Sequence, residues 1–293
     1  MMAKLENSWR LFKASITVTF KHRKLLWFPF LITFLTVFIA LFFISAMVLP
    51  VAAAHHWLAL KHYFAPTPAV GAAYVICVPL LYLLSMFLAT FFNVAFYSEI
   101  IAALNGKDVS FQRGLATAYG RLPSIIVWSL FAGLVGWLIR SLERRLPFAA
   151  RIFTGFIGLA WSIAAVFAIP VIIQEQPMRN PLKILQQSAT TLKKAWGEGL
   201  IGYVGFSAVS AAFFLGSLPP ILLAGALAYL FKSVWIVAIA LAIWLISLLV
   251  MVYISGVAGN VYRCALYLYA AEGVIPEPYD QEMLDMAWKV KAA

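Results

Sequence analysis

Six long apolar segments, none interrupted by a charged residue, decide what this chain can fold into. A helix needs about 20 predominantly apolar residues to cross the hydrocarbon core of a bilayer. Segments of this length and polarity are typical of membrane-spanning helices, and we predict one such helix for each. The six segments cover residues 25–49, 70–96, 123–139, 152–173, 200–218 and 234–258.

The composition agrees with this prediction. Of the 293 residues, 64% are hydrophobic and 11% are charged, whereas soluble domains have about 45–50% apolar and about 25% charged residues. These values exclude a soluble globular domain, a disordered chain and a secreted disulfide scaffold. The expected fold class is all-α, a polytopic membrane protein with six transmembrane helices.

The fifth span is the hardest to bound, because residues 200–231 carry no charge. This stretch is too long for one span and too short for two. Proline does not continue a helix comfortably, so the prediction ends the fifth span before Pro219 and Pro220. Residues 221–231 then form a short apolar segment at or dipping into the membrane interface.

Lys and Arg residues are distributed unevenly along the chain. With the N-terminus inside, 16 of the 22 fall in the cytoplasmic segments 1–24, 99–122, 174–198 and 259–293. Cytoplasmic loops are enriched in these residues, so we expect both termini on the cytoplasmic side of a bacterial-type inner membrane. The net charge of +11 is then explained by topology, and no nucleic acid partner is expected. A five-span alternative, in which residues 123–139 do not cross, gives a weaker bias.

An amphipathic segment precedes each odd-numbered span. Apolar residues recur every three or four positions along residues 5–20, 111–122 and 182–196, which places them on one stripe of a helix. We predict three amphipathic helices on the cytoplasmic membrane surface. In the first, the predicted apolar stripe consists of Leu5, Trp9, Phe12, Ile16 and Phe20.

The regular alternation of one surface helix and two spans predicts a threefold internal repeat. Its units are residues 1–98, 108–173 and 181–262. They belong to a single integral membrane domain, residues 1–272, and a cytoplasmic tail, residues 273–293, follows it. The alternative is that surface helices commonly precede spans and that nothing repeats.

Several short motifs resemble a known family. They are Leu5-Glu6-Asn7-Ser8-Trp9, Phe92-Asn93-Val94-Ala95, Arg140-Ser141-Leu142-Glu143-Arg144, Pro170 with Glu175, Ser188, and Lys194-Ala195-Trp196-Gly197-Glu198. The chain resembles an uncharacterised prokaryotic family of six-span membrane proteins, defined as a domain of unknown function. In hydropathy it also resembles the membrane domain of glycerophosphodiester phosphodiesterases, whose catalytic domain has no counterpart here. The resemblance covers most of the chain and implies no catalytic residues.

The predicted spans contain no Asp, Glu, Lys, Arg or His. Ion-coupled transporters and proton pumps generally use an ionisable residue within the membrane, so this class is disfavoured. No P-loop, nucleophile elbow or metal-binding motif is present. His55, His56 and His62 cluster in the first outer loop, but Trp57 and Tyr63 beside them favour an interfacial aromatic belt over a metal site. We predict no enzymatic activity and no catalytic, cofactor or metal site.

Two groups of residues are candidate sites. The first follows the third span, and its Arg side chains suit an anionic lipid headgroup or a contact between subunits; the alternative is that they extend to the interface and form one local ion pair. This group is Arg140, Glu143, Arg144, Arg145 and Arg151. The second recurs near the cytoplasmic ends of the even-numbered spans and predicts a polar path; the alternative is ordinary hydrogen bonding at helix ends. This group is Asn93, Glu99, Gln174, Glu175, Asn260 and Glu272.

Together these patterns favour a non-enzymatic protein that interacts with membrane lipids, as a scaffold or assembly factor. The alternative is an oligomeric channel or facilitator for small solutes or lipids. The expected partners are membrane lipids and further copies of the same chain. The two hypotheses differ in what fills the space between the spans, lipid in the first and a continuous polar path in the second.

Overall fold

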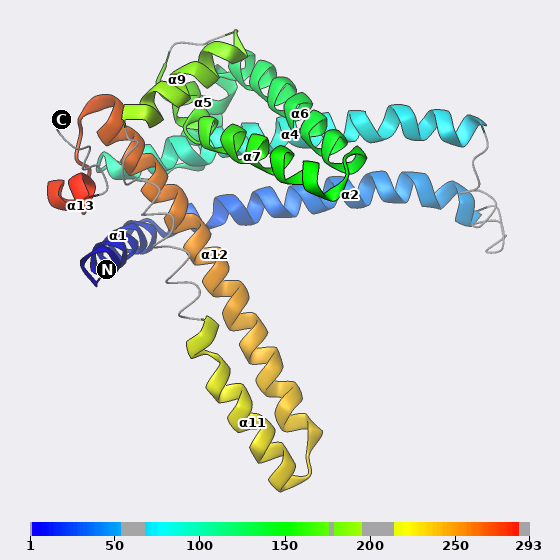
Figure 1. Ribbon diagram of the computed structural model, residues 1–293, viewed down its shortest axis with the longest axis vertical. Helices are drawn as coiled ribbons and strands as arrows, with labels where there is room; N and C mark the ends of the chain where they lie inside the picture. The colour runs from blue at the N-terminus through cyan, green and yellow to red at the C-terminus, as the bar shows by residue number, and fades with distance from the viewer. Residues whose placement is uncertain (1, 54–67, 176–178, 195–213, 287–293) are drawn as a thin grey trace. The chain divides into compact units, whose positions relative to one another are not determined.

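The computed structural model describes residues 2–53, 68–175, 179–194 and 214–286, and every regular element in these ranges is a helix (Figure 1). The predicted all-α fold class is confirmed. The helices are α1 (Met2–Lys21), the 3-10 helix η1 (Arg23–Leu26), α2 (Trp27–Ala53), α4 (Pro68–Leu104), α5 (Phe111–Gly120), α6 (Leu122–Arg145), α7 (Phe148–Ala164), α8 (Ala168–Gln174), α9 (Pro181–Lys194), α11 (Leu218–Phe231), α12 (Val234–Glu272) and α13 (Gln281–Met286).

Six segments of these helices are long and apolar enough to cross a membrane, as the sequence predicts. The shortest predicted span, 123–139, lies within α6, whose 24 residues suffice for a crossing. The candidate spans are Arg23–Leu41, Pro79–Leu104, Leu122–Arg145, Phe153–Gln174, Phe214–Phe231 and Val234–Glu272.

The fifth span differs from its prediction. The apolar segment of spanning length is Phe214–Phe231, and most of the predicted window, 200–218, lies outside the described residues. Pro219 and Pro220 begin helix α11 instead of ending a helix. The N–H groups in the first turn of a helix have no carbonyl partner within the helix, so proline, which lacks an N–H, costs no hydrogen bond there. Its fixed φ also suits this position. Residues 221–231 therefore belong to helix α11, within the 18-residue candidate span Phe214–Phe231, and do not form a separate short segment. Their predicted position at the membrane interface stays a prediction.

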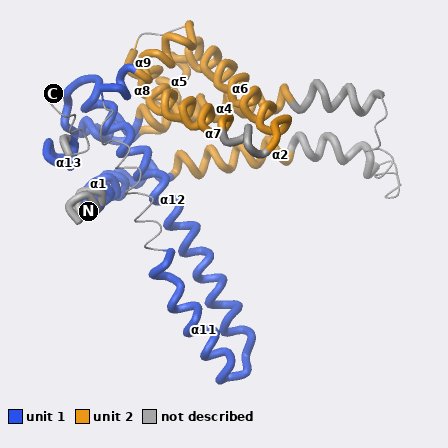
Figure 2. Tube along the Cα trace, in the orientation of Figure 1, with its two compact units in different colours: residues 1–26, 99–109, 190–293 blue, residues 27–98, 110–189 orange. Residues whose placement is uncertain are grey.

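Contacts divide the chain into two compact units (Figure 2). Unit 1 contains residues 1–26, 99–109 and 190–293, and unit 2 contains residues 27–98 and 110–189. Each of the three segments predicted to repeat contributes residues to both units. The division therefore does not follow the predicted repeat, which stays a prediction.

Helix α12 organises unit 1. Its 39 residues give a length of about 58 Å at 1.5 Å per residue, roughly twice the hydrocarbon thickness of a bilayer. Its first part pairs with α11 in an apolar hairpin whose side chains, Trp235 and Ile239 among them, are exposed. Its last part, from Val257 to Leu268, is largely buried where α12 packs on α1. One long helix thus joins an exposed apolar hairpin to the core of unit 1.

Aromatic contacts join the helices of unit 2. Phe28 at the start of α2 stacks on Phe96 of α4 and on Phe111 of α5, with ring centroids 5.6 and 4.4 Å apart. Helices α6 and α7 pack through Trp128 and Trp161, whose stacked rings lie 6.0 Å apart. Such pairs contribute about 0.5–1.5 kcal/mol beyond the burial of their area, and here they link segments far apart in the sequence.

A buried hydroxyl bridges a break in the fourth span. Helix α7 ends at Ala164 and α8 begins at Ala168. The N–H of Phe167 donates to the Ser188 hydroxyl at 3.0 Å, and this hydroxyl donates to the Ala164 carbonyl at 2.6 Å. Ser188 is fully buried, so water does not reach the backbone groups that it bonds at the break. Helix α9 therefore supplies the hydrogen-bond partner that these groups need.

Candidate functional site

Helix α1 has three distinct faces. Its buried face packs in the core of unit 1 and includes Leu11, Phe12, Ser15, Val18 and Thr19. Of the described members of the predicted apolar stripe, only Phe12 belongs to this face. Trp9 and Phe20 remain 53% and 46% exposed, and Ile16 between them is half-buried. The third face is polar and carries Arg10, Lys13, Thr17 and Lys21 beside the exposed stripe.

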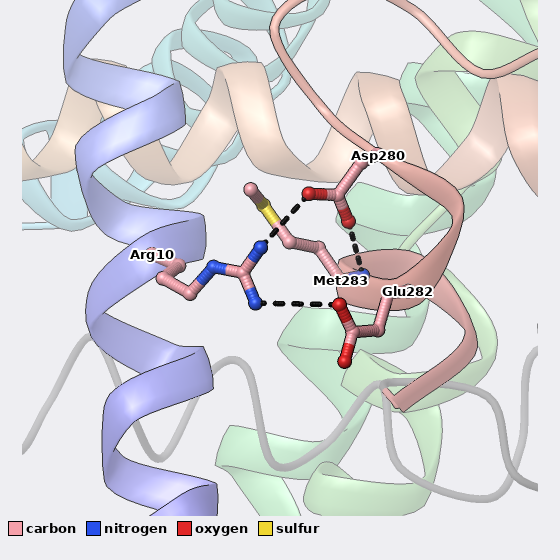
Figure 3. A network of polar contacts seen from close by, with 4 residues as sticks. All are labelled: Arg10, Asp280, Glu282 and Met283. Carbon is pink, nitrogen blue, oxygen red and sulfur yellow. Dashed lines mark hydrogen bonds and ion pairs between the residues drawn. The ribbon is translucent and has the colours of Figure 1, made fainter.

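An ion-pair clasp ties the chain after α12 to this first helix (Figure 3). The guanidinium of Arg10 donates to the carboxylate of Asp280 at 2.9 Å and lies 3.7 Å from the carboxylate of Glu282. The second oxygen of Asp280 accepts from the Met283 N–H at 2.7 Å. This carboxylate therefore caps the first turn of α13 and binds α1 at the same time.

A buried hydrogen bond reinforces the clasp. The hydroxyls of Ser15 and Tyr279 lie 2.7 Å apart, and Ser15 also donates to the Leu11 carbonyl at 2.8 Å. Burial raises the pKa of the Tyr279 phenol, although the hydrogen bond with Ser15 lowers it in part. The phenol therefore stays protonated at neutral pH and can serve as the donor to Ser15.

A cavity of about 390 Å³ lies beside this clasp, within unit 1. Ligand pockets are commonly about 300–1,000 Å³, with apolar walls and a few polar groups. This cavity has that character, and we refer to it as the α1 pocket. It is lined by Thr17, Val18, Lys21 and His22 of the α1 end, by residues 103–106 of the α4 end, and by residues 274–278 after α12.

Two glycines reverse the chain at the walls of the α1 pocket. Gly106 follows α4 with φ 74°, and Gly273 follows α12 with φ 69°. Positive φ is accessible to glycine without steric cost. After Gly273, the Val274 N–H donates to the Leu268 carbonyl at 3.4 Å, as in a common helix ending. These turns bring the three wall segments together.

The polar groups of the α1 pocket are balanced in charge. Lys21 and Glu277 contribute one charge of each sign, and Asn105 adds an amide. Burial, and then the neighbouring charge of Lys21, lower the pKa of His22, while Asp108 raises it. His22 is therefore mainly neutral at pH 7, because its pKa lies below the ordinary value of 6.5. The pocket can pair with a cationic and an anionic group of one ligand.

The predicted arginine cluster lies at the end of α6. Arg140, Arg144 and Arg145 are exposed and Glu143 is half-buried. Among the described residues, Glu143 forms no ion pair with these arginines. Arg151, the fifth member, belongs to α7, and its side chain lies outside the described set. Arg144 and Arg145 are in the last turn of α6, where positive charge complements the helix dipole.

The residues predicted to line a polar path fall in both units. Asn93, Gln174 and Glu175 belong to unit 2, and Glu99, Asn260 and Glu272 belong to unit 1. Glu99 is fully buried, whereas Glu272 is exposed at the end of α12. The path itself stays a prediction.

Glu175 has partners from two other elements of unit 2. The guanidinium of Arg121, at the junction of α5 and α6, donates to the carbonyls of Ile173 and Glu175 at 2.9 and 2.5 Å. The amide of Gln187 donates to the Glu175 carboxylate at 3.2 Å. A cation at the end of α8 satisfies its last carbonyls and complements its dipole, so this cluster has a clear structural role.

Sequence reasoning does not find the α1 pocket. Lys21 and His22 resemble the basic flank of any first span, and Glu277 lies in a proline-rich tail segment. The signal that could have indicated the pocket is the position of Lys21 and His22, which directly precede the first candidate span at Arg23. Within the described residues, no group of three or more His, Cys, Asp or Glu side chains is arranged to hold a metal ion. The histidines of the predicted first outer loop, residues 55–62, lie outside the described part.

These features define a class: a multi-pass α-helical membrane protein whose first helix and tail, with the end of α4, enclose a polar–apolar pocket. A family match covers residues 72–276, most of the chain, and its description is Family of unknown function (DUF6159). The chain belongs to this family. The resemblance to a domain of unknown function is thereby confirmed. No curated protein and no solved structure matches the chain.

Proposed function

We propose that this protein is a non-enzymatic, lipid-interacting scaffold or assembly factor of a bacterial-type inner membrane, with both termini in the cytoplasm. Its partners in this proposal are membrane lipids and further copies of the chain. Six charge-poor candidate spans and the basic bias of the segments between them support the location.

The three faces of α1 carry the proposal. One face is held in the core of unit 1, so the helix cannot turn to bury its other apolar side. The stripe of Trp9, Ile16 and Phe20 therefore stays on the outside, beside Lys13 and Lys21. Apolar residues next to basic ones are typical of helices that lie in the interface of an anionic membrane. Each basic residue near such a surface contributes about 1 kcal/mol.

Site-specific thiol labelling tests the proposal. In a chain with Cys77 and Cys264 replaced by Ala, single cysteines are placed on the apolar stripe (Trp9→Cys or Phe20→Cys) or on the polar face (Lys13→Cys). A membrane-impermeant maleimide is added to inside-out vesicles and, separately, to right-side-out vesicles.

We expect Lys13→Cys to react rapidly in inside-out vesicles only, and the two stripe cysteines to react at least about tenfold more slowly there. Solubilisation in detergent followed by denaturation should make all three equally reactive, which controls for intrinsic differences. Equal labelling of Lys13→Cys and Trp9→Cys in intact inside-out vesicles would show that the stripe lies in water and would contradict the proposal. Labelling from the opposite side would contradict the orientation.

The channel alternative has less support from the described residues. The hydroxyls of Ser85 and Thr90, in the second candidate span, each donate to a carbonyl one turn earlier in their own helix at 2.8 Å. Flux of ions and small solutes in proteoliposomes tests the alternative. The scaffold proposal predicts flux at the level of protein-free liposomes under several ionic and osmotic gradients.

A further inference from the structure

The α1 pocket carries one positive and one negative side chain. A purely anionic ligand would leave the negative side chain unpaired, and an apolar ligand would leave both unpaired. Lys21 and Glu277 both line the same cavity, and both are exposed at its rim. An ammonium group suits phosphate as a point charge, and a carboxylate accepts several N–H bonds. A ligand with one phosphate and one ammonium group would satisfy both residues, with the Asn105 amide as a further donor.

The remaining walls distinguish between kinds of ammonium. The pocket is lined by no Phe, Tyr or Trp within the described residues. Quaternary ammonium groups are usually recognised by aromatic cages, which this pocket lacks. A primary ammonium, in contrast, donates hydrogen bonds directly to a carboxylate such as that of Glu277. The lining therefore favours an ethanolamine group over a choline group.

The apolar lining of the pocket and its position along the chain also suit a lipid. Val18 and Leu104 are buried in its walls, and Ile275 is partly exposed beside them. Lys21 and His22 directly precede Arg23, where the first candidate span begins. At this point the chain passes between water and membrane, and a lipid there presents its phosphate and glycerol region.

We propose that the α1 pocket binds a phosphoethanolamine group, with Lys21 and Asn105 facing the phosphate and Glu277 facing the primary ammonium. This inference rests on the proposed interaction with lipids and deepens it by naming a headgroup. The same chemistry occurs in an ethanolamine phospholipid and in a soluble phosphoethanolamine ester, and the experiment separates these two sources.

The test uses the full chain, delipidated in detergent and then incubated with an equimolar mixture of three phospholipids with identical acyl chains. Their headgroups are ethanolamine, choline and glycerol, and the lipids retained per protein are measured by native mass spectrometry. We expect the ethanolamine lipid to be retained at least about fivefold over the other two, because charge-assisted hydrogen bonds to both ends of the headgroup are available.

Two variants with matched controls assign the binding to the pocket. Glu277→Gln should abolish the preference for ethanolamine over glycerol headgroups, because it removes the anion that faces the ammonium. Lys21→Gln should reduce retention of the ethanolamine lipid about fivefold. Lys24→Gln, in the same basic run, and Glu282→Gln, in the same tail, do not line the pocket and should leave the preference unchanged.

A competition arm separates the sources. If millimolar phosphoethanolamine displaces the lipid and this depends on Glu277, the soluble ester is a ligand; if it does not displace it, the ligand is the lipid. Either result supports the assignment of the headgroup. Retention of glycerol or choline lipids equal to that of the ethanolamine lipid, or an unchanged preference in Glu277→Gln, would overturn it. Lipid retention without headgroup preference would leave the proposed function standing, whereas a chain that retains no lipid would contradict the proposed function itself.

Discussion

Ser15 and Tyr279 share a buried hydrogen bond of 2.7 Å, although 264 positions separate them in the chain. This bond joins the first helix of the protein to the segment that follows its last candidate span. The same segment forms one wall of the α1 pocket. The pocket therefore depends on contacts between the two ends of the chain.

Removing the Tyr279 hydroxyl should loosen this junction. In Tyr279→Phe the Ser15 hydroxyl keeps its bond to the Leu11 carbonyl, so only one hydrogen bond is lost. The expected cost is about 1 kcal/mol of the free energy of unfolding, measured by titration with SDS in mixed micelles. Tyr229→Phe is the control, because this side chain is 86% exposed. Equal stability of the two variants would contradict the contribution assigned to the Ser15–Tyr279 bond.

The two carboxylates that face Arg10 should not be equivalent. Asp280 caps α13 as well as pairing with Arg10, whereas Glu282 is largely exposed. Asp280→Ala should remove the cap, which is typically worth about 1 kcal/mol, and speed hydrogen exchange of the Met283 amide about fivefold. Glu282→Ala should leave this exchange almost unchanged. A larger effect from Glu282→Ala would show that the ion pair, and not the cap, orders α13.

Ser188 should matter more than other serines of unit 2. Ser188→Ala leaves the Phe167 N–H and the Ala164 carbonyl without the partner that they have in the fully buried break. Leaving buried polar groups unsatisfied costs about 1–3 kcal/mol, again measured by SDS titration. Ser162→Ala is the matched control, because the exposed Ser162 hydroxyl only donates to a carbonyl of its own helix. A loss in Ser188→Ala no larger than in the control would refute the bridging role.

The pKa of His22 should respond to its two charged neighbours in opposite directions. Burial is the first cause of its lowered pKa and Lys21 the second, while Asp108 acts against them. Lys21→Gln should therefore raise the pKa of His22 towards 6.5, and Asp108→Asn should lower it further. Both shifts can be followed by NMR titration of the imidazole, with His22→Gln for assignment and Lys24→Gln as control. Shifts of the same sign in both variants would contradict this arrangement.

The same group sets a pH dependence of stability. Since the folded pKa of His22 lies below the unfolded value of 6.5, the unfolded state binds the proton more readily. The contribution to stability is therefore complete above pH 6.5 and declines as the pH falls from there to the folded pKa. His22→Gln should flatten this part of the stability profile, and an unchanged slope would assign the dependence to another group.

The spans were predictable because apolar character is a local property of the sequence. Segments without charge long enough to cross a bilayer are recognisable without knowing their neighbours. The helix that begins at Pro219 and Pro220 was not predicted, because two prolines are compatible with either end of a helix, and only the helix that follows them, α11, decides between the two.

The buried face of α1 was not predictable by the same means. Ser15 and Thr19 lie in the core and Trp9 lies outside it, because a hydroxyl that bonds a backbone carbonyl is tolerated in a protein interior. Periodicity does not distinguish an apolar face turned towards protein from one turned towards lipid. The α1 pocket was equally hidden, because its walls come from three segments that only the fold brings together.

A structure of the full chain extracted with its native lipids into polymer nanodiscs tests the central claim most directly. The account predicts acyl-chain density along the stripe of Trp9, Ile16 and Phe20, with Lys13 and Lys21 at the level of the phosphates. A second protein surface packed on this stripe, or a stripe that faces bulk water while a continuous polar path crosses the membrane, would contradict it.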